Sequence, residues 1–516
     1  MLPPLVFFLL IPLLCLSFVV SVTQNAAATR INCGATNLTS INGLQYLPDE
    51  NFTSSGTRRA VNFPNLPSPL LSTVRSFPLA INKKFCYVVP TFRSINYLIR
   101  TTFFYGGVNG PDFPSPPVFD QIIDGTIWRL VNTSEDYNRN ASTYYEGVFM
   151  SKGKSISVCL GANTLTDSDP FISSLEIVML SNSVYNSTNF TSHGLNLIAR
   201  HNFGGSNASI RYPEDKFDRI WEPFDGQMEG SNTTSTQTKV AGIWNQPPAA
   251  LFDTAMTSSA ESLAFKWPPL LLPLPNSSYY MSFYFAKTEP FISESNAALD
   301  VAINNVTYYK NMPLTEIGTA VFSANWSLGG ETTISLFPAV GSNAAPSING
   351  GELFQVVTLG RRTHARDVLA LIDISSSLEN PPPDWSGDPC VPRQYAWTGL
   401  SCSEGDRIRV VSLDLTGMNL SGSLSPKIGR LTALSDILLG NNKLSGPIPD
   451  LAPLKLLRRL HLDNNTFTGS IPLSLGDSRS LKEIFLQNNN LTGAVPSTLS
   501  GKGIDLRTEG NPLLQR

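Results

Sequence analysis

The stretch LRRLHLDNNTFTGSIP, residues 457–472, is followed by a close copy of itself, LKEIFLQNNNLTGAVP, at residues 481–496. In both copies an apolar residue stands at the first, fourth and sixth positions and asparagine at the ninth, and an aliphatic–proline pair closes the unit. Two earlier copies start at Val410 and Leu434, so the ninth positions are separated by 24, 23 and 24 residues. A period of this length is typical of proteins that stack one short unit on the next.

Each copy predicts a short strand followed by a return loop. The apolar residues would point into a shared core, and the asparagine side chain would bond the backbone of adjacent turns. The first copy carries Met418 at the asparagine position and departs from the pattern. The Leu-x-Gly-x-Ile-Pro ending resembles the leucine-rich repeat of plant extracellular proteins. The resemblance implies a short right-handed α/β solenoid of about four turns over residues 410–500, with residues 501–516 as a C-terminal tail.

The segment DWSGDPCVPRQYAWTGLSC, residues 384–402, precedes the first repeat, whose open core end needs a cap. Trp385 and Trp397 are placed to cover that end, and a disulfide between Cys390 and Cys402 would stabilise the cap by about 3 kcal/mol. A zinc site is the alternative for a cysteine pair, but no second pair or histidine cluster stands nearby. The Gly-Asp-Pro-Cys motif resembles the junction of symbiosis-type receptor kinases, and the cap resembles that of plant receptor-kinase ectodomains.

Upstream of the cap, runs of Val, Ile, Tyr, Phe and Thr broken by Gly, Pro and Asn predict β structure. Several phrases occur twice in the same order; for example, YLPDENF from Tyr46 matches YPEDKFDRIW from Tyr212, 166 residues later. We therefore expect two tandem all-β sandwiches. The phrases INCG, FCY, YLIR, FFYGG and PFISSLEI together resemble the malectin-like tandem of plant receptor kinases. The whole chain then resembles a malectin-like, leucine-rich-repeat ectodomain, with no membrane span or kinase after EGNPLL.

Between these regions, HARDVLALIDI has apolar residues at 368, 369, 371 and 372 and predicts a one-faced helix, which prolines 381–383 would stop. The predicted organisation is a signal peptide (1–23), malectin-like domains (30–195 and 196–360), a linker helix with its proline stop (361–383), the repeat cap (384–409), the repeats (410–500) and the tail (501–516).

Residues 5–20 form an almost unbroken apolar run that is short for a membrane span and typical of a secretory signal. The alternative is a retained N-terminal anchor. No later run has spanning length, so we expect a protein secreted to the extracellular space (apoplast) through the endoplasmic reticulum. Acceptor triplets for N-glycans agree with this compartment. They begin at Asn37, Asn51, Asn132, Asn140, Asn186, Asn189, Asn207, Asn232, Asn276, Asn305, Asn325, Asn419, Asn464 and Asn490.

Removal of the signal would leave five cysteines, an odd number for an oxidising compartment. Cys390 and Cys402 are close in sequence and are expected to pair. Among the other three, Cys86 and Cys159 lie in strand-like segments and are favoured as a pair over pairs with Cys33, whose partner stays open.

Formal net charge is −3 with scattered lysine and arginine, which argues against a nucleic-acid partner. The histidines do not cluster, and motifs for serine hydrolases, P-loops and zinc proteases are missing from the sequence. Aspartate pairs such as Asp215 and Asp218 could imitate glycosidase acids, but turn aspartates are commoner. We expect no enzyme activity, cofactor or metal.

Two binding surfaces are predicted. By resemblance to animal malectin, Tyr284 and Phe285 mark a sugar-contacting pair, with Phe104 and Tyr105 as the equivalent pair in the first sandwich. Aromatic residues of strands more often fill cores. On the repeats, the outward positions between inner leucines form one column, in which apolar residues suggest a protein or peptide partner. The column is Asp414, Leu438, His461 and Phe485.

The sequence therefore predicts a secreted, non-enzymatic recognition protein for a carbohydrate (a cell-wall or glycan oligosaccharide), a secreted peptide or a receptor. The alternatives are a soluble co-receptor or decoy for a membrane receptor kinase without sugar binding, and then a glycan-processing enzyme.

Overall fold

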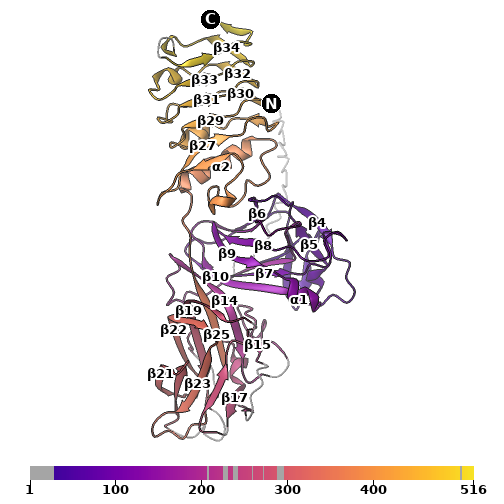
Figure 1. Cartoon of the computed structure of the whole chain (residues 1–516), viewed down its shortest axis with the longest axis vertical. Helices are drawn as coiled ribbons and strands as arrows, with labels where there is room; N and C mark the ends of the chain where they lie inside the picture. The colour runs from indigo at the N-terminus through magenta and orange to yellow at the C-terminus, as the bar shows by residue number, and fades with distance from the viewer. Residues whose placement is uncertain are drawn as a thin grey trace, which may run out of the picture.

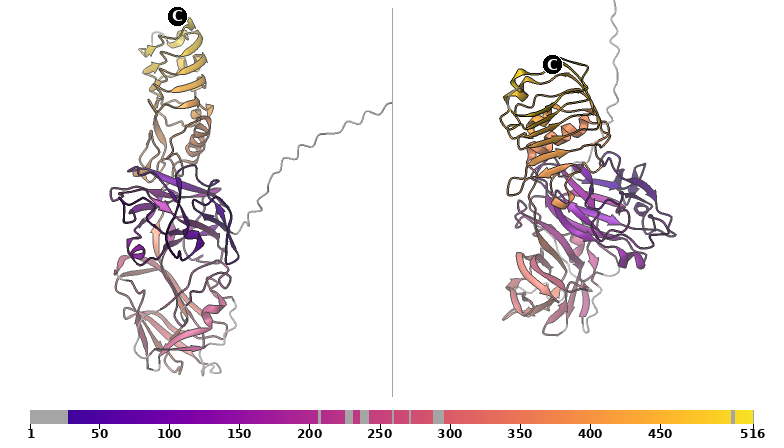
Figure 2. Two further views of the ribbon diagram at one scale, coloured as in Figure 1. Left: turned by 90° about the vertical axis from the view of Figure 1, so that its right-hand side faces the viewer. Right: turned by 45° about the horizontal axis from the view of Figure 1, so that its top comes forward.

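The computed structural model describes residues 28–205, 208–224, 231–235, 242–258, 260–270, 272–287, 296–499 and 503–515. The predicted signal peptide lies outside these residues. The molecule is elongated: the repeats and the C-terminus occupy one end, and β structure fills the rest (Figure 1). Two further views show the same arrangement, with residues before about 195 lying between the repeats and the later strands (Figure 2).

One sheet of eleven strands runs through the N-terminal β region. Its order is β2 (Thr39–Ile41), β3 (Leu44–Pro48), β1 (Ala28–Asn32), β13 (Ser174–Met179), β7 (Asn96–Phe103), β10 (Thr143–Met150), β14 (His193–Asn202), β25 (Gly350–Thr358), β19 (Leu274–Phe285) and β22 (Thr319–Gly330), with β15 (Glu222–Pro223) on β14. Strand β14 pairs with β10 on one side and β25 on the other, and it straddles the domain boundary expected at 195/196. The two halves therefore share one continuous sheet.

Smaller sheets complete each half. They are β6 (Lys84–Pro90), β11 (Ser155–Gly161), β8 (Phe119–Ile123) and β9 (Thr126–Val131); β12 (Phe171–Ile172), β5 (Thr73–Ser76) and β4 (Thr57–Ala60); β16 (Ser231–Ser235), β17 (Thr254–Ser258) and β24 (Ser347–Ile348); and β18 (Leu263–Lys266), β23 (Thr333–Pro338), β20 (Ala298–Ile303) and β21 (Val306–Pro313). Helical turns are short: α1 (Ser134–Asn138), η1 (Pro69–Leu71), η2 (Ala249–Phe252), η4 (Arg393–Tyr395), η5 (Pro426–Arg430), η6 (Leu473–Asp477) and η7 (Ser497–Leu499).

The alternation of side chains explains why these segments are strands. In β20, Leu299, Val301 and Ile303 are buried while their neighbours are half-exposed, as the two-residue period of a strand requires. The buried residues form one core in the first half, around Phe103 and Phe171, and another in the second half, around Phe283. Each half therefore has its own apolar interior beside the shared sheet.

The repeat region, residues 400–515, contains two parallel ladders. The first is β27 (Val410–Asp414), β29 (Asp436–Leu438), β31 (Arg459–His461), β33 (Glu483–Phe485) and β35 (Asp505–Arg507), with β26 (Leu400–Cys402) antiparallel to β27. The second is β28 (Ser421–Ser423), β30 (Lys443–Pro447), β32 (Thr466–Ser470), β34 (Asn490–Ala494) and β36 (Leu513–Gln515). Residues 503–515 thus add a fifth turn, which corrects the expectation of a tail.

Buried asparagines bond each turn to the one before it, as the repeat pattern predicts. Asn465 is typical: its Nδ2 donates to the carbonyls of Leu439 (2.9 Å) and Leu462 (3.2 Å), and its Oδ1 accepts the Leu444 N–H (2.9 Å). Asn511 does the same for the fifth turn. The leucine pattern missed this turn because Gly503 and Thr508 replace leucines there, although Asn511 follows Asn489 by 22 residues.

Replacing Asn465 with alanine is expected to destabilise the repeats by about 1–3 kcal/mol, because buried backbone groups on two turns lose their partner. Hydrogen exchange at the Leu444 amide measures the effect locally, which matters in a chain with several cores. Lys443→Ala, an exposed change beside Leu444 in the second turn, is the control. Equal Leu444 protection in both variants would argue against the asparagine's role.

Helix α2 (Ala365–Ser377) occupies the predicted linker and packs on the first repeat. Its buried face is Ala370, Leu371 and Ile374, whereas Leu369 and Ile372 are exposed, so the predicted helix is confirmed but its predicted apolar face is only partly correct. The reason is Asp367, which is buried: it accepts the Val410 N–H at 3.0 Å and so turns the helix toward β27.

Candidate functional site

The outward side chains of the first parallel ladder form a two-row surface, which we call the strand face. Its rows are Ser412, Asp436, Arg459, Glu483 and Asp505, and Asp414, Leu438, His461, Phe485 and Arg507. Strand register places the four residues of the predicted column directly beside one another. Their alignment is confirmed; their role in binding a partner stays a prediction.

Three side chains in the second row stack across consecutive turns. The rings of His461 and Phe485 lie 4.1 Å apart and nearly parallel, at 13°, and the Arg507 guanidinium lies 4.0 Å over the Phe485 ring. Glu483 bonds the His461 Nε2 at 3.0 Å. Stacking covers part of the Phe485 ring, which is half-buried, and the neighbouring Leu438 is half-buried as well. His461, Phe485 and Arg507, with the neighbouring Leu438, therefore form one continuous, preformed surface, which we call the ledge.

Ion pairs hold the charged side chains of the strand face in place. Arg459 contacts Asp436 at 2.5 Å, and Arg507 contacts Asp505 at 2.8 Å. Burial raises the pKa of Asp436, but the hydrogen bonds from Arg459 and Ser435, together with the charge of Arg459, outweigh it, so the pKa is lowered. The Arg507 hydrogen bond likewise lowers the pKa of Asp505. Sequence reasoning missed Arg507 because it missed the fifth turn.

The four aromatic residues predicted to contact sugar lie in cores. Tyr284 and Phe285 are 0% exposed, and Phe104 and Tyr105 are 1% exposed. The Tyr284 hydroxyl donates to Glu352 at 2.7 Å, and the Tyr105 hydroxyl donates to a backbone carbonyl. A covered ring cannot stack on a pyranose, so the structure contradicts this prediction. These strands carry aromatic residues to fill the cores.

A different aromatic pair reaches the surface of the second half. Trp244 and Phe322 stack at 4.7 Å with rings nearly parallel, at 2°. Trp244 lines a cavity of about 440 Å³ together with Ser183, Lys216 and Gln246. Polar groups beside an open ring are typical of small-ligand sites, and no sequence motif had marked these residues.

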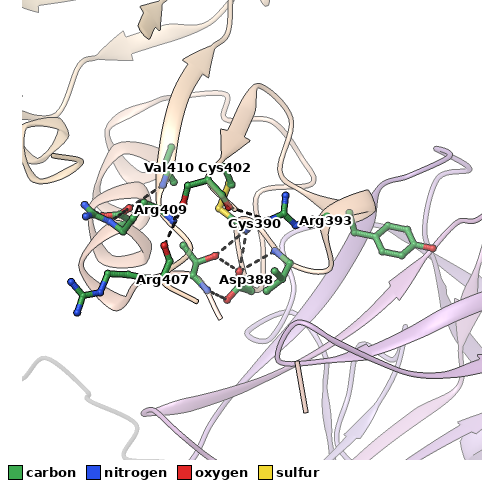
Figure 3. Close-up of a disulfide and its surroundings, with 12 residues drawn as sticks. Asp388, Cys390, Arg393, Cys402, Arg407, Arg409 and Val410 are labelled. Carbon is green, nitrogen blue, oxygen red and sulfur yellow. Dashed lines mark hydrogen bonds and ion pairs between the residues drawn. A yellow bond between two sulfur atoms is a disulfide. The ribbon is translucent and has the colours of Figure 1, made fainter. Parts of the chain in front are cut away.

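The predicted disulfide between Cys390 and Cys402 closes the cap (Figure 3). Asp388 of the Gly-Asp-Pro-Cys motif organises the loop beside it, since its Oδ1 accepts the N–H groups of Cys390 (3.0 Å) and Val391 (3.2 Å). The rings of Trp385 and Trp397 stack at 5.3 Å over the first turn. The sequence therefore identified the cap and its bridge correctly.

The cap also packs on the first half, which the sequence did not predict. Gly387 lies against the second disulfide, Cys86–Cys159, which joins β6 and β11. The Tyr395 hydroxyl donates to Asp120 at 2.7 Å, and the buried Lys84 ammonium donates to the Tyr395 carbonyl. Burial lowers the pKa of Lys84 to about 8. This junction connects the repeats to the first half of the β region.

A buried ionic network crosses the boundary between the two halves. Arg200 bridges Glu146 of the first half and Glu352 of the second, both at 2.7 Å. Arg100 contacts Glu146 at 2.7 Å and Asp218 at 3.4 Å. Burial opposes the charge of Arg100, but the surrounding carboxylates outweigh it and raise its pKa.

The aspartates considered as glycosidase acids belong to this network. Asp215 pairs with Arg219 at 2.8 Å, and Asp218 pairs with Arg211 at 3.0 Å as well as with Arg100. Burial raises the pKa of Asp218, but Arg100 and Arg211 outweigh that effect and lower it. A carboxylate held ionised by arginines is a poor general acid, and the pair fits a structural role.

The remaining candidate features are metal ligands, a membrane span, the free cysteine and the glycan acceptors. Within the described ranges, no cluster of three potential metal-ligating side chains occurs, and no helix has the length and apolarity to cross a membrane. Cys33 is an unpaired, buried thiol whose pKa burial raises. The described glycan-acceptor asparagines are all exposed; they are Asn37, Asn51, Asn132, Asn140, Asn186, Asn189, Asn276, Asn305, Asn325, Asn419, Asn464 and Asn490. Asn207 and the Asn232 side chain lie outside the described part.

Known protein families match the same two regions of the chain, the N-terminal β region and the repeats. The family model described as malectin-like domain matches residues 31–356, and the leucine-rich repeat model matches residues 456–478 and 480–501. A receptor-like protein kinase of Arabidopsis thaliana, At3g21340, is 31% identical over 77% of this chain and 44% of its own length. A probable LRR receptor-like serine/threonine-protein kinase, At1g67720, is 29% identical over 88% and 50%. The chain thus spans about half the length of these relatives.

Solved structures share the fold at low sequence identity. The ANX1 ectodomain of Arabidopsis thaliana superposes with a TM-score of 0.53 at 17% identity, over 64% of this chain and 97% of that one. A structure described as plant peptide RALF23 in complex with FER and LLG2 gives a TM-score of 0.50 at 16% identity, over 64% and 95%. At such identities the likeness concerns the fold.

Proposed function

This chain belongs to the malectin-like domain family, and from that premise we propose that it is a non-enzymatic, extracellular recognition protein. In this proposal two tandem malectin-like sandwiches, the halves on either side of β14, support a short right-handed solenoid of leucine-rich repeats. The solenoid presents the strand face to a peptide or protein partner. The extracellular assignment draws support from the exposed glycan acceptors and the two disulfides.

The observation that carries the proposal is the stacked ledge on the strand face. His461, Phe485 and Arg507 are already held in one arrangement. Binding a partner would therefore cost little of the conformational entropy of these three side chains. Leu438 adds apolar area beside charged groups, a combination found at protein interfaces. A fold relative is described as a complex of FER with a peptide and LLG2, and that description makes a peptide or receptor partner reasonable for this chain. A soluble co-receptor or decoy role fits the same surface.

Replacing Leu438 and Phe485 together with aspartate is expected to abolish capture of the partner while leaving secretion normal, because both side chains are surface residues of the ledge. The measurement is affinity capture from cell-wall and membrane extracts. Leu456→Asp with Leu473→Asp, two exposed leucines outside the strand face, is the matched control. Capture that survives the first pair of changes unaltered would remove the strand face as the binding surface.

The second function that we propose is carbohydrate binding, in which Trp244, rather than the buried Tyr284 or Tyr105, would contact the sugar. The stack of Trp244 on Phe322 offers an aromatic platform, and Lys216, Gln246 and Ser183 supply hydrogen-bonding groups around the cavity. Defined oligosaccharides that raise the melting temperature of the parent, but not of a Trp244→Ala variant, would support it.

A further inference from the structure

We propose that the strand face binds an extended peptide segment with a basic residue, an apolar residue two positions later and a second basic residue four positions after the first. This inference rests on the proposed function, because it names the partner class of the same surface. It follows from the positions of two carboxylates and of the ledge between them.

The arginines of the strand face already form ion pairs with aspartates, but two of its carboxylates are not ion-paired with a lysine or an arginine among the described residues. Arg459 pairs with Asp436, and Arg507 pairs with Asp505. Glu483 hydrogen-bonds the imidazole of His461, and Asp414 accepts the Thr416 N–H of its own turn. The guanidinium of Arg459 feels the charge of both carboxylates but contacts neither of them closely. Among the described residues, neither Asp414 nor Glu483 forms an ion pair with lysine or arginine. These two carboxylates are therefore the positions at which the face complements added positive charge.

Strand register fixes the separation of the two carboxylates. Asp414 lies on β27 and Glu483 on β33, three strands along the ladder and in the neighbouring row. With strands spaced by about 4.8 Å and two residues of offset, the positions are about 16 Å apart. An extended segment advances about 13 Å over four residues, and its first, third and fifth side chains share one side. Lysine or arginine side chains are long enough to cover the remaining distance.

The apolar residue of such a segment would fall near the middle of the ledge. Leu438 lies one strand from Asp414, and His461 lies on the next strand, so both are between the carboxylates. Both are half-buried, which leaves apolar surface to cover. Burying one aliphatic side chain there would contribute about 1.5–3 kcal/mol before entropic costs.

Two further features of the repeats restrict the orientation of the segment. Exposed Arg458 and Lys482 precede β31 and β33 directly, so a basic segment shifted toward that edge meets like charge. The glycan acceptors of the repeats, Asn419, Asn464 and Asn490, lie outside the two rows of the strand face. The acceptor side chains are thus not part of the rows, and repulsion at one edge favours the register described above.

The test uses the full chain and synthetic peptides of twelve residues, each made of three four-residue repeats. The matching probe is (Lys-Thr-Leu-Thr)₃; the controls are (Lys-Leu-Thr-Thr)₃, which places leucine on the opposite side, and (Glu-Thr-Leu-Thr)₃. Binding is measured by fluorescence anisotropy at two salt concentrations. We expect the matching probe to bind about tenfold more tightly than either control, and more weakly as salt is raised.

Variants connect the binding to the two carboxylates. Asp414→Ser with Glu483→Gln removes both charges without creating a glycan-acceptor triplet, and it is expected to weaken binding of the matching probe about fivefold. Asp477→Asn with Glu404→Gln removes two charges from exposed residues outside the strand face and leaves that binding unchanged. Equal binding of all three peptides, or equal binding by both variants, overturns this inference. Loss of partner capture in the Leu438 and Phe485 variant would then still support the proposed function, so the two ideas fail separately.

Discussion

Replacing Arg200 with methionine is expected to lower the free energy of unfolding of the N-terminal β region by about 3–5 kcal/mol, because it leaves two buried carboxylates without their shared partner. The Arg200 side chain is 0% exposed and pairs with Glu146 and Glu352, one from each half of the shared sheet. Thermal and denaturant unfolding followed by circular dichroism measures the loss.

Two control variants separate the network from the general effect of losing a cation. Lys266→Met removes a pair in which Lys266 and Glu331 are both more than 70% exposed, and its effect is expected to stay within about 0.5 kcal/mol. Adding Glu352→Gln to the Arg200 variant should restore part of the stability, since Glu352 then carries no buried charge, whereas Glu146 keeps Arg100 as its partner. An Arg200 variant as stable as the Lys266 variant would show that the network contributes little.

Replacing Gly387 with alanine is expected to loosen the junction between the cap and the first half and to cost about 2–4 kcal/mol. Gly387 has a φ of +70°, and an added Cβ would lie 2.6 Å from the Cys86 sulfur and 3.0 Å from the Cys159 sulfur. A disulfide within a strand pair cannot move aside as a flexible side chain does. Faster hydrogen exchange in η4 and in β11, on the two sides of the junction, together with a lower melting temperature, would be the measured signs.

Gly405→Ala is the matched control for the junction. Gly405 lies in the same cap with a φ of +89°, but an added Cβ there meets no atom within 4 Å. Its variant therefore carries the backbone cost of alanine at positive φ, about 1 kcal/mol, without the clash. Similar losses in the two variants would mean that contact with the Cys86–Cys159 disulfide adds nothing.

Several features of the molecule follow from local pattern alone. The 23- to 24-residue period predicted the strands of the first four turns and the buried asparagines of the second, third and fourth. The cysteine spacing predicted the Cys390–Cys402 bridge. The tendency to pair Cys86 with Cys159 is confirmed as well. These successes share a cause: each depends on residues that are neighbours within a turn or directly across two strands.

The candidate sites could be predicted less well. The column on the strand face was located correctly because register repeats with the sequence, but the Arg507 contribution was lost with the irregular fifth turn. The sugar-contact predictions for Tyr284 and Tyr105 failed for a common reason: an aromatic residue in or beside a strand can point to either side, and here both side chains point into cores. The Trp244 cavity had no sequence signal at all.

What the sequence determined by itself is the repeat, its capped end, and a long β-rich region of malectin-like character, since period and side-chain alternation are properties of short stretches. Only the tertiary structure decided that β14 joins two halves in one sheet, that Arg200 links Glu146 to Glu352, and that Gly387 rests on the Cys86–Cys159 disulfide. The partners in each of these contacts are far apart in the chain. Which distant segments meet depends on how whole sheets pack, and no local pattern records that choice.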